Sequence, residues 1–187
     1  MRLAIFGGTF DPIHSAHLTV AREAAEEYRL DHVLFVPGAH PPHKADTATS
    51  YEHRFRMVEL ACAGDFRFVP SRLEEGQDQS YTYYTIERVK QTLGSMDELF
   101  FLIGADAFAE IGTWHRSEEV IHAVQFLVVT RPGHFYHLPR GARVHRLETL
   151  ALPVSSSEIR QKLAGGEKVE ELPVAVFEYI RLHHLYR

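Results

Sequence analysis

The sequence predicts an α/β fold in which a parallel sheet is covered by helices on both faces. Short apolar runs of strand length alternate with helical patterns of about ten or more residues along almost the whole chain. Connections of that length imply right-handed crossovers, which make neighbouring strands parallel and place helices on both sides of the sheet. No linker, low-complexity tract or internal repeat divides the chain, so we expect one domain spanning 1–187.

The expected elements follow one another in a regular order. Apolar, β-branched or aromatic runs predict strands at 2–6, 32–36, 66–70, 99–103, 124–129 and 144–147. Helical spacing predicts helices at 15–28, 51–63, 80–93 (with Ser80 as its cap), after 104–106, at 155–163 and at 174–183. The carboxyl ends of parallel strands meet at one sheet edge, so ligand-binding groups are expected in the loops after Phe6, Val36, Ile103 and Val129.

Composition excludes several classes of protein. A hydrophobic content of 45% and a charged content of 24% are ordinary for a soluble globular protein. The formal net charge of −5 argues against a nucleic-acid partner, although local basic pockets for small phosphorylated ligands are allowed. The lone Cys62 excludes an internal disulfide and suits a reducing compartment. Without a signal-peptide pattern or an apolar run of roughly 18 residues, we expect a cytoplasmic protein with no membrane partner; a homo-oligomer is allowed.

The loop after the first strand has the strongest chemical signal. Residues 7–17 read Gly-Gly-Thr-Phe-Asp-Pro-Ile-His-Ser-Ala-His. A glycine turn exposes backbone N–H groups and a helix N-terminus adds positive potential, so together they form an anion site. His14 and His17, either protonated or hydrogen-bonding, could stabilise the negative charge that builds up on a phosphate. The string matches neither a Walker A loop nor a Gly-x-Gly-x-x-Gly fingerprint. Histidines that merely cap the helix are a weaker alternative, because two of them stand three residues apart directly after a glycine turn. A zinc site is also weaker, because no adjacent glutamate and no cysteine cluster completes a set of zinc ligands.

A second motif lies near the C-terminus, where 155–160 read Ser-Ser-Ser-Glu-Ile-Arg at the start of a predicted helix. Serine hydroxyls, helix N-terminal amides and an arginine fork together make a phosphate clamp. Taken alone, the segment reads better as a helix cap. Its pairing with the first motif, at the opposite end of the chain, favours a second phosphate-binding element.

Both motifs resemble those of the nucleotidylyltransferase superfamily, which has His/Thr-x-Gly-His after a glycine turn and Ser-Ser-x-x-Ile-Arg at a helix start. The segments 41–44, 80–82, 101–106, 113–115, 131–133 and 184–187 further resemble the bacterial nicotinate-nucleotide adenylyltransferase family. This likeness covers nearly the whole chain. It implies a Rossmann-like doubly wound parallel sheet of the nucleotidylyltransferase type. It also implies transfer of the adenylyl group of ATP to nicotinate mononucleotide, giving deamido-NAD and pyrophosphate.

The resemblance also implies the residues of the site. His14, His17 and Arg160 would be catalytic. ATP would meet Gly7, Gly8, Thr9, Phe10, Gly104, Asp106, Ser155, Ser156 and Ile159, with the C-terminal part from about 155 to 187 completing its site. Nicotinate mononucleotide would meet Lys44, Thr82, Thr85, Trp114 and Arg131. Mg²⁺ would bridge ATP oxygens without a dedicated protein site. From the residues alone, Asp106 reads equally well as a helix cap and Trp114 as a core residue.

Two departures and four alternatives stay open. Ala16 stands where the family usually has glycine, and Tyr84 stands where a smaller or polar residue is expected. Phosphopantetheine adenylyltransferase shares both phosphate motifs, although Trp114 and the chain length argue against it. Nicotinamide mononucleotide differs from nicotinate by one charge, and backbone amides could make that discrimination. A non-catalytic nucleotide-sensing module would bind without turnover, and a histidine-rich metal-binding protein would carry metal.

Overall fold

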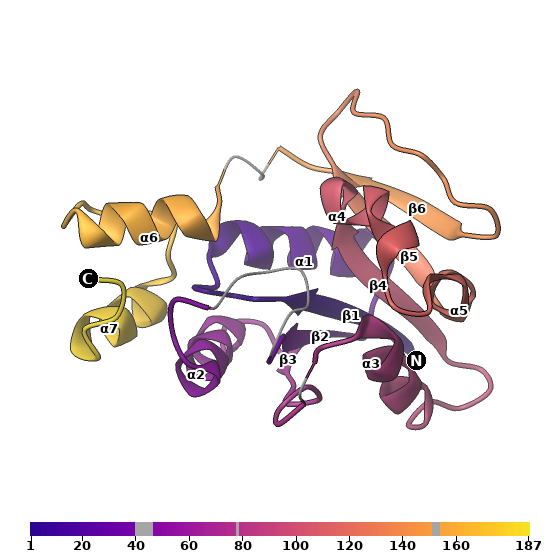
Figure 1. The fold of residues 1–187 in the computed structure, drawn as a ribbon, viewed down its shortest axis with the longest axis horizontal. Helices are drawn as coiled ribbons and strands as arrows, with labels where there is room; N and C mark the ends of the chain where they lie inside the picture. The colour runs from indigo at the N-terminus through magenta and orange to yellow at the C-terminus, as the bar shows by residue number, and fades with distance from the viewer. Residues whose placement is uncertain (40–46, 78, 151–153) are drawn as a thin grey trace.

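A six-stranded, wholly parallel sheet forms the centre of the computed structural model, which describes residues 1–39, 47–77, 79–150 and 154–187 (Figure 1). The spatial order of the strands is β3-β2-β1-β4-β5-β6. The strands are β1 (Arg2–Gly8), β2 (His32–Pro37), β3 (Phe68–Pro70), β4 (Glu98–Gly104), β5 (Gln125–Thr130) and β6 (Arg143–Glu148). This order is that of a doubly wound Rossmann-like sheet, so the predicted fold class is confirmed.

Helices connect most of these strands. They are α1 (Ser15–Glu27), α2 (Tyr51–Cys62), α3 (Thr82–Lys90), α4 (Ala105–Ala109), the 3-10 turn η1 (Ile111–Thr113), α5 (Ser117–Ala123), α6 (Ser156–Ala164) and α7 (Val174–Leu182). One local prediction was wrong. Helix α3 begins at Thr82, and its N-cap residue is Tyr81 rather than Ser80. The connection from β5 to β6 runs through 131–142 without a helix.

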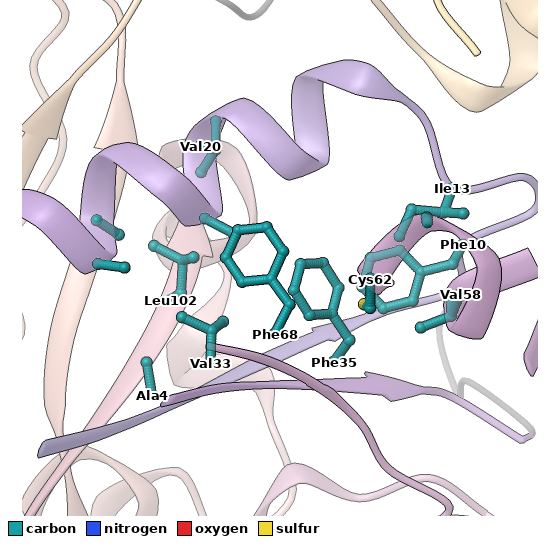
Figure 2. Close-up of a cluster of buried hydrophobic side chains, with 14 of the residues drawn as sticks. Ala4, Phe10, Ile13, Val20, Val33, Phe35, Val58, Cys62, Phe68 and Leu102 are labelled. Carbon is teal, nitrogen blue, oxygen red and sulfur yellow. The ribbon is translucent and has the colours of Figure 1, made fainter. Parts of the chain in front are cut away.

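The sheet separates two apolar cores. Residues alternate along each strand, so Ala4 and Leu102 face the side covered by α1, α2, α6 and α7, whereas Ile5 and Phe101 face α3, α4 and α5. Both sets are buried, which explains why the strands read as continuous apolar runs. Figure 2 shows the first core, where the side chains of Phe35 and Phe68 lie between the sheet and α1.

Strand order reverses between β1 and β4, and this reversal places the site. The chain winds outward from β1 to β3, then returns to lay β4 on the other side of β1. The helices that follow β1 and β4 therefore lie on opposite faces and leave a crevice beyond the ends of these two strands. Gly8 ends β1 and Gly104 ends β4, so both glycine-containing loops open into this crevice.

The C-terminal part packs at one end of the sheet. Figure 1 shows α6, α7 and the chain terminus beside α1 and α2, at the end away from α3 and α5. Val176 and Ile180 of α7 and Ile159 of α6 are buried in the first core. Among the described residues, no helix has the length and apolarity that a membrane crossing requires.

Candidate active site

The turn that follows β1 is shaped by close packing around Phe10. A Cβ added to Gly8 would lie 2.9 Å from the Phe10 ring, so glycine is needed there. Phe10 adopts a left-handed conformation with φ 50°, which costs a non-glycine residue about 1 kcal/mol. Its ring is 2% exposed and packs edge-on against Phe6 and His17, with ring centroids 5.7 and 5.1 Å away. Burial of this ring thus holds the turn in its strained shape.

A buried arginine holds the same turn through a hydrogen bond to its backbone. Arg54 of α2 is 1% exposed, and its Nη1 donates to the carbonyl oxygens of Thr9 and Gly38, each at 2.8 Å. Burial lowers the pKa of the guanidinium, while the neighbouring Asp11 opposes this change. The side chain therefore links the loops after β1 and β2 and places a positive charge behind the turn. Helical periodicity indicated only an amphipathic helix here and did not identify this role.

His14 and His17 stack at the start of α1, with ring centroids 3.7 Å apart. His14 is the N-cap, and its backbone N–H donates to Nδ1 of His17 at 3.2 Å. Because Nδ1 of His17 accepts, its proton lies on Nε2, which is then a hydrogen-bond donor. Burial lowers the pKa of His14 to about 4, and within the described part of the chain its buried Nδ1 has no partner. His14 is therefore uncharged near neutral pH, so its side chain could contact a phosphate only through hydrogen bonds.

The low pKa of His14 predicts loss of stability in mild acid. The unfolded imidazole binds a proton below its ordinary pKa of 6.5, whereas the folded one stays neutral down to about 4. Falling pH in this window therefore favours the unfolded chain. We expect this residue to lower the free energy of unfolding by about 2 kcal/mol between about pH 7.5 and 5. Urea unfolding of wild type and His14→Gln checks it: a pH dependence equal in both proteins would contradict the assignment.

Helix α6 brings the second motif onto the first. Ser156 Oγ donates to the carbonyl of Pro12 at 3.0 Å, and Arg160 Nη1 donates to the carbonyl of Asp11 at 2.7 Å. These residues are 144 and 149 positions apart in the sequence. Ser155 caps α6 in a capping box with Glu158, and the side chain of Ile159 is fully buried in the core. Its backbone N–H donates to the carbonyl of Ser155 at 3.1 Å, so in this arrangement Ile159 offers no surface to ATP, contrary to the expectation.

A cavity of about 230 Å³ opens beyond the ends of β1 and β4. It is lined by the glycine turn (Gly7, Gly8, Thr9), by Gly104, by Ser80 and Thr82, and by Trp114. The indole packs edge-on against Phe101, with ring centroids 6.2 Å apart and planes at 77°. The ring of Tyr81 stacks on that of His115, with ring centroids 4.4 Å apart, and this contact joins the 80–82 and 113–115 segments. The structure thus gathers Thr82 and Trp114 with the glycine turn.

Thr85 needs a correction. Its hydroxyl was expected to receive a nicotinate carboxylate, but the side chain is 2% exposed and donates to Glu74 Oε1 at 2.6 Å. A hydroxyl has one proton, so in this arrangement it is not available to a ligand carboxylate. Glu74 is itself 7% exposed and lines the Trp114 cavity. The sequence reasoning missed Glu74, because an acidic residue in a polar loop has no distinguishing pattern.

Asp106 and Arg131 share a separate cavity of about 350 Å³ with Thr130 and His134. The sequence assigned Asp106 to ATP and Arg131 to the mononucleotide, whereas the structure places both in the lining of this one cavity, after β4 and β5. Gly104, not Asp106, is the N-cap of α4, and Asp106 lies exposed in its first turn. Lys44 lies outside the described residues. Tyr84 is exposed and packs near His115, and Ala16 is buried in the first turn of α1.

The donor set does not resemble a metal centre. Within 1–39, 47–77, 79–150 and 154–187, no group of three or more His, Cys, Asp or Glu side chains could hold a metal ion. Cys62 is buried, and burial raises the pKa of its thiol to about 12. Its sulfur is therefore a poor nucleophile and lies in the core rather than at the site.

Comparisons with known proteins agree with this geometry. A family model described as cytidylyltransferase-like matches residues 5–162. A protein of Solibacter usitatus, named probable nicotinate-nucleotide adenylyltransferase, is 59% identical over 187 residues, covering 100% of both chains. The chain belongs to the nicotinate-nucleotide adenylyltransferase family. A relative of the same name from Thermus thermophilus is 43% identical over 190 residues, again covering 100% of both chains.

Solved structures extend the likeness to the fold. The nicotinic acid mononucleotide adenylyltransferase of Plasmodium falciparum, solved as a complex with NaAD, superposes with a TM-score of 0.82. The match covers 99% of this chain and 97% of that one, at 20% sequence identity. At such low identity the sheet order and helix arrangement are retained while most side chains differ. The family fold is therefore the α/β arrangement described above.

Proposed function

We propose that the protein transfers the adenylyl group of ATP to nicotinate mononucleotide and releases deamido-NAD and pyrophosphate. One observation carries the proposal: α6 meets the turn that leads into α1 through Ser156 and Arg160, beside the cavity that contains Trp114, so the two candidate phosphate-binding motifs lie together. Two helix N-termini supply sites for a polyphosphate, and the adjacent aromatic cavity suits a planar ring.

The proposed reaction is an in-line displacement without a protein nucleophile. An oxygen of the mononucleotide phosphate forms a bond to the α-phosphorus of ATP. The bond from that phosphorus to the oxygen that bridges the α- and β-phosphates breaks. Pyrophosphate leaves with the electron pair. The protein contributes by positioning both substrates and by stabilising the charge that moves onto pyrophosphate.

His17 has the central role in this proposal. Its Nε2–H donates to a phosphate oxygen of ATP and strengthens that bond as charge develops. His14 fixes the tautomer of His17 through its backbone N–H. Arg160 makes one contact to Asp11 and one to Ser157, at 3.2 Å, so further guanidinium N–H groups remain for the β- and γ-phosphates. The C-terminal part, from about 155 to 187, completes the ATP site in this way.

The second substrate is assigned to the Trp114 cavity. We propose that its pyridine ring stacks on the indole, that Thr82 and nearby amides meet its carboxylate, and that Arg131 and Asp106 meet phosphate or ribose groups. Mg²⁺ would accompany ATP on its phosphate oxygens and supply further charge neutralisation there. We propose a cytoplasmic location, in keeping with the single, unpaired cysteine.

Pyrophosphate release tests the proposal. The purified protein is incubated with ATP and Mg²⁺ and, separately, with nicotinate mononucleotide, nicotinamide mononucleotide or phosphopantetheine. We expect strong preference for nicotinate mononucleotide and formation of deamido-NAD. Release with phosphopantetheine alone would keep the ATP site but overturn the assignment of the Trp114 cavity. ATP binding without release would instead indicate a nucleotide-sensing module.

A further inference from the structure

The penultimate residue of the chain reaches the phosphate-binding turn. Tyr186 donates its hydroxyl proton to Asp11 Oδ1 at 2.5 Å, across 175 positions of sequence. Burial and the neighbouring Asp11 raise the pKa of the Tyr186 phenol, so the group stays protonated and remains a donor. The mechanism proposed above uses neither side chain. Asp11 nevertheless belongs to the turn that is proposed to bind ATP, and Tyr186 contacts it directly.

Asp11 joins three remote parts of the chain at the centre of the turn. Its carboxylate is 3% exposed and accepts from the backbone N–H of Ala48 at 2.7 Å in addition to Tyr186. Its own carbonyl accepts from Arg160 at 2.7 Å. Asp11 therefore connects the segment before α2, the helix α6 and the chain terminus to a turn of six residues, 9–14.

The backbone of the chain terminus is itself strained. After α7, His184 and Tyr186 both adopt left-handed conformations, with φ 56° and 60°. Non-glycine residues adopt this conformation at a cost in free energy, and they keep it where surrounding contacts hold it. The Tyr186 ring packs against the first core, and its hydroxyl meets Asp11. The strained tail thus ends in a directed contact with the turn.

We propose that Tyr186 is a positioning residue for adenylyl transfer, which acts through Asp11 to hold the turn 9–14 in the shape that presents His17 and the turn amides to ATP. This inference rests on the proposed function. A bond from a hydroxyl to a buried carboxylate is among the stronger hydrogen bonds of a protein. Its loss lets the turn move while the apolar packing beneath it stays in place.

The variant Tyr186→Phe tests the proposal because it removes only the hydroxyl. We expect binding of α,β-methylene ATP, measured by calorimetry, to weaken about tenfold, and kcat to fall by about tenfold or more. Binding of nicotinate mononucleotide, followed by fluorescence of the single tryptophan, is expected to stay within about twofold because Trp114 lies in a different wall of the site. Binding of the ATP analogue at the wild-type level would overturn the proposal.

Tyr28→Phe is the matched control. Tyr28 is also partly buried, and its hydroxyl donates to the carbonyl of Arg146 at 2.9 Å, on the opposite end of α1 from the turn. Both variants lose one tyrosine hydrogen bond, so their melting temperatures are expected to fall by similar amounts. Only Tyr186→Phe is expected to change ATP-analogue binding. Equal weakening in both variants would reduce Tyr186 to a structural role and overturn the proposal.

A double-mutant cycle keeps the test decisive if one variant is unstable. Tyr186→Phe and Asp11→Ala, which removes the acceptor, are combined, and the losses in analogue binding are compared below the melting temperature of each protein. If Tyr186 acts through Asp11, the double variant is no weaker than Asp11→Ala alone; additive losses would overturn the proposal. Analogue binding does not depend on the second substrate. Absence of transfer by the wild type would therefore count against the proposed function and not against this positioning role.

Discussion

Replacement of His17 by alanine is expected to lower kcat for adenylyl transfer by about a hundredfold to a thousandfold. The reason is the loss of an Nε2–H donor aimed at developing charge, for which losses of this size are typical. His17 is only half-buried, and its ring packs against His14, Phe6 and Phe10 without belonging to either apolar core. The fold should therefore survive, with a melting temperature within a few degrees of wild type.

Steady-state pyrophosphate release, together with circular dichroism, measures this effect. His122→Ala is the control, because that imidazole is exposed on α5, where its Nδ1 lies 2.7 Å from the carbonyl oxygen of Glu118. We expect His122→Ala to turn over at the wild-type rate. Wild-type turnover by a folded His17→Ala protein would remove His17 from the mechanism.

Replacement of Trp114 by alanine is expected to raise the KM for nicotinate mononucleotide by about tenfold to a hundredfold. The indole is half-buried in the cavity wall, so its removal takes away both a stacking surface and apolar contact area. The KM for ATP should change by less than about twofold, because the phosphate-binding turn and α6 do not rest on the indole.

Trp114→Phe is the matched variant for this prediction. A phenyl ring retains a flat face for stacking and the edge-on contact with Phe101, so most of the affinity is expected to return. KM values for both substrates are measured for all three proteins. Equal increases in the two KM values of Trp114→Ala would mean that the mononucleotide binds elsewhere.

Strand positions were predictable because the signal is local. The run Leu99 to Ile103 is buried on both faces, and only a central parallel strand combines that apolar content with that length. Helix starts were less predictable. Ser80 is a good cap by residue type, yet the chain enters α3 at Thr82, and Ser80 lines the cavity instead. Capping preference is weak compared with the contacts that place a segment beside the site.

Buried polar contacts were not predictable from the sequence. Arg54 lies in an ordinary amphipathic pattern, and only the approach of two loops from β1 and β2 gives its guanidinium three carbonyl partners. Thr85 was interpreted as a ligand contact, and only packing of α3 against the 71–77 segment places Glu74 against its hydroxyl. Such partners are remote in sequence, so no local window contains them.

The strands, most of the helices, the two motifs and the family were predictable from the sequence, since these depend on short-range periodicity and on contiguous strings of residues. Only the folded chain shows that α6 contacts the turn after β1, that Asp106 and Arg131 line one cavity, and that Tyr186 reaches Asp11. The physical reason is that hydrogen bonds of buried groups are satisfied by whichever segments the folded chain brings within about 3 Å.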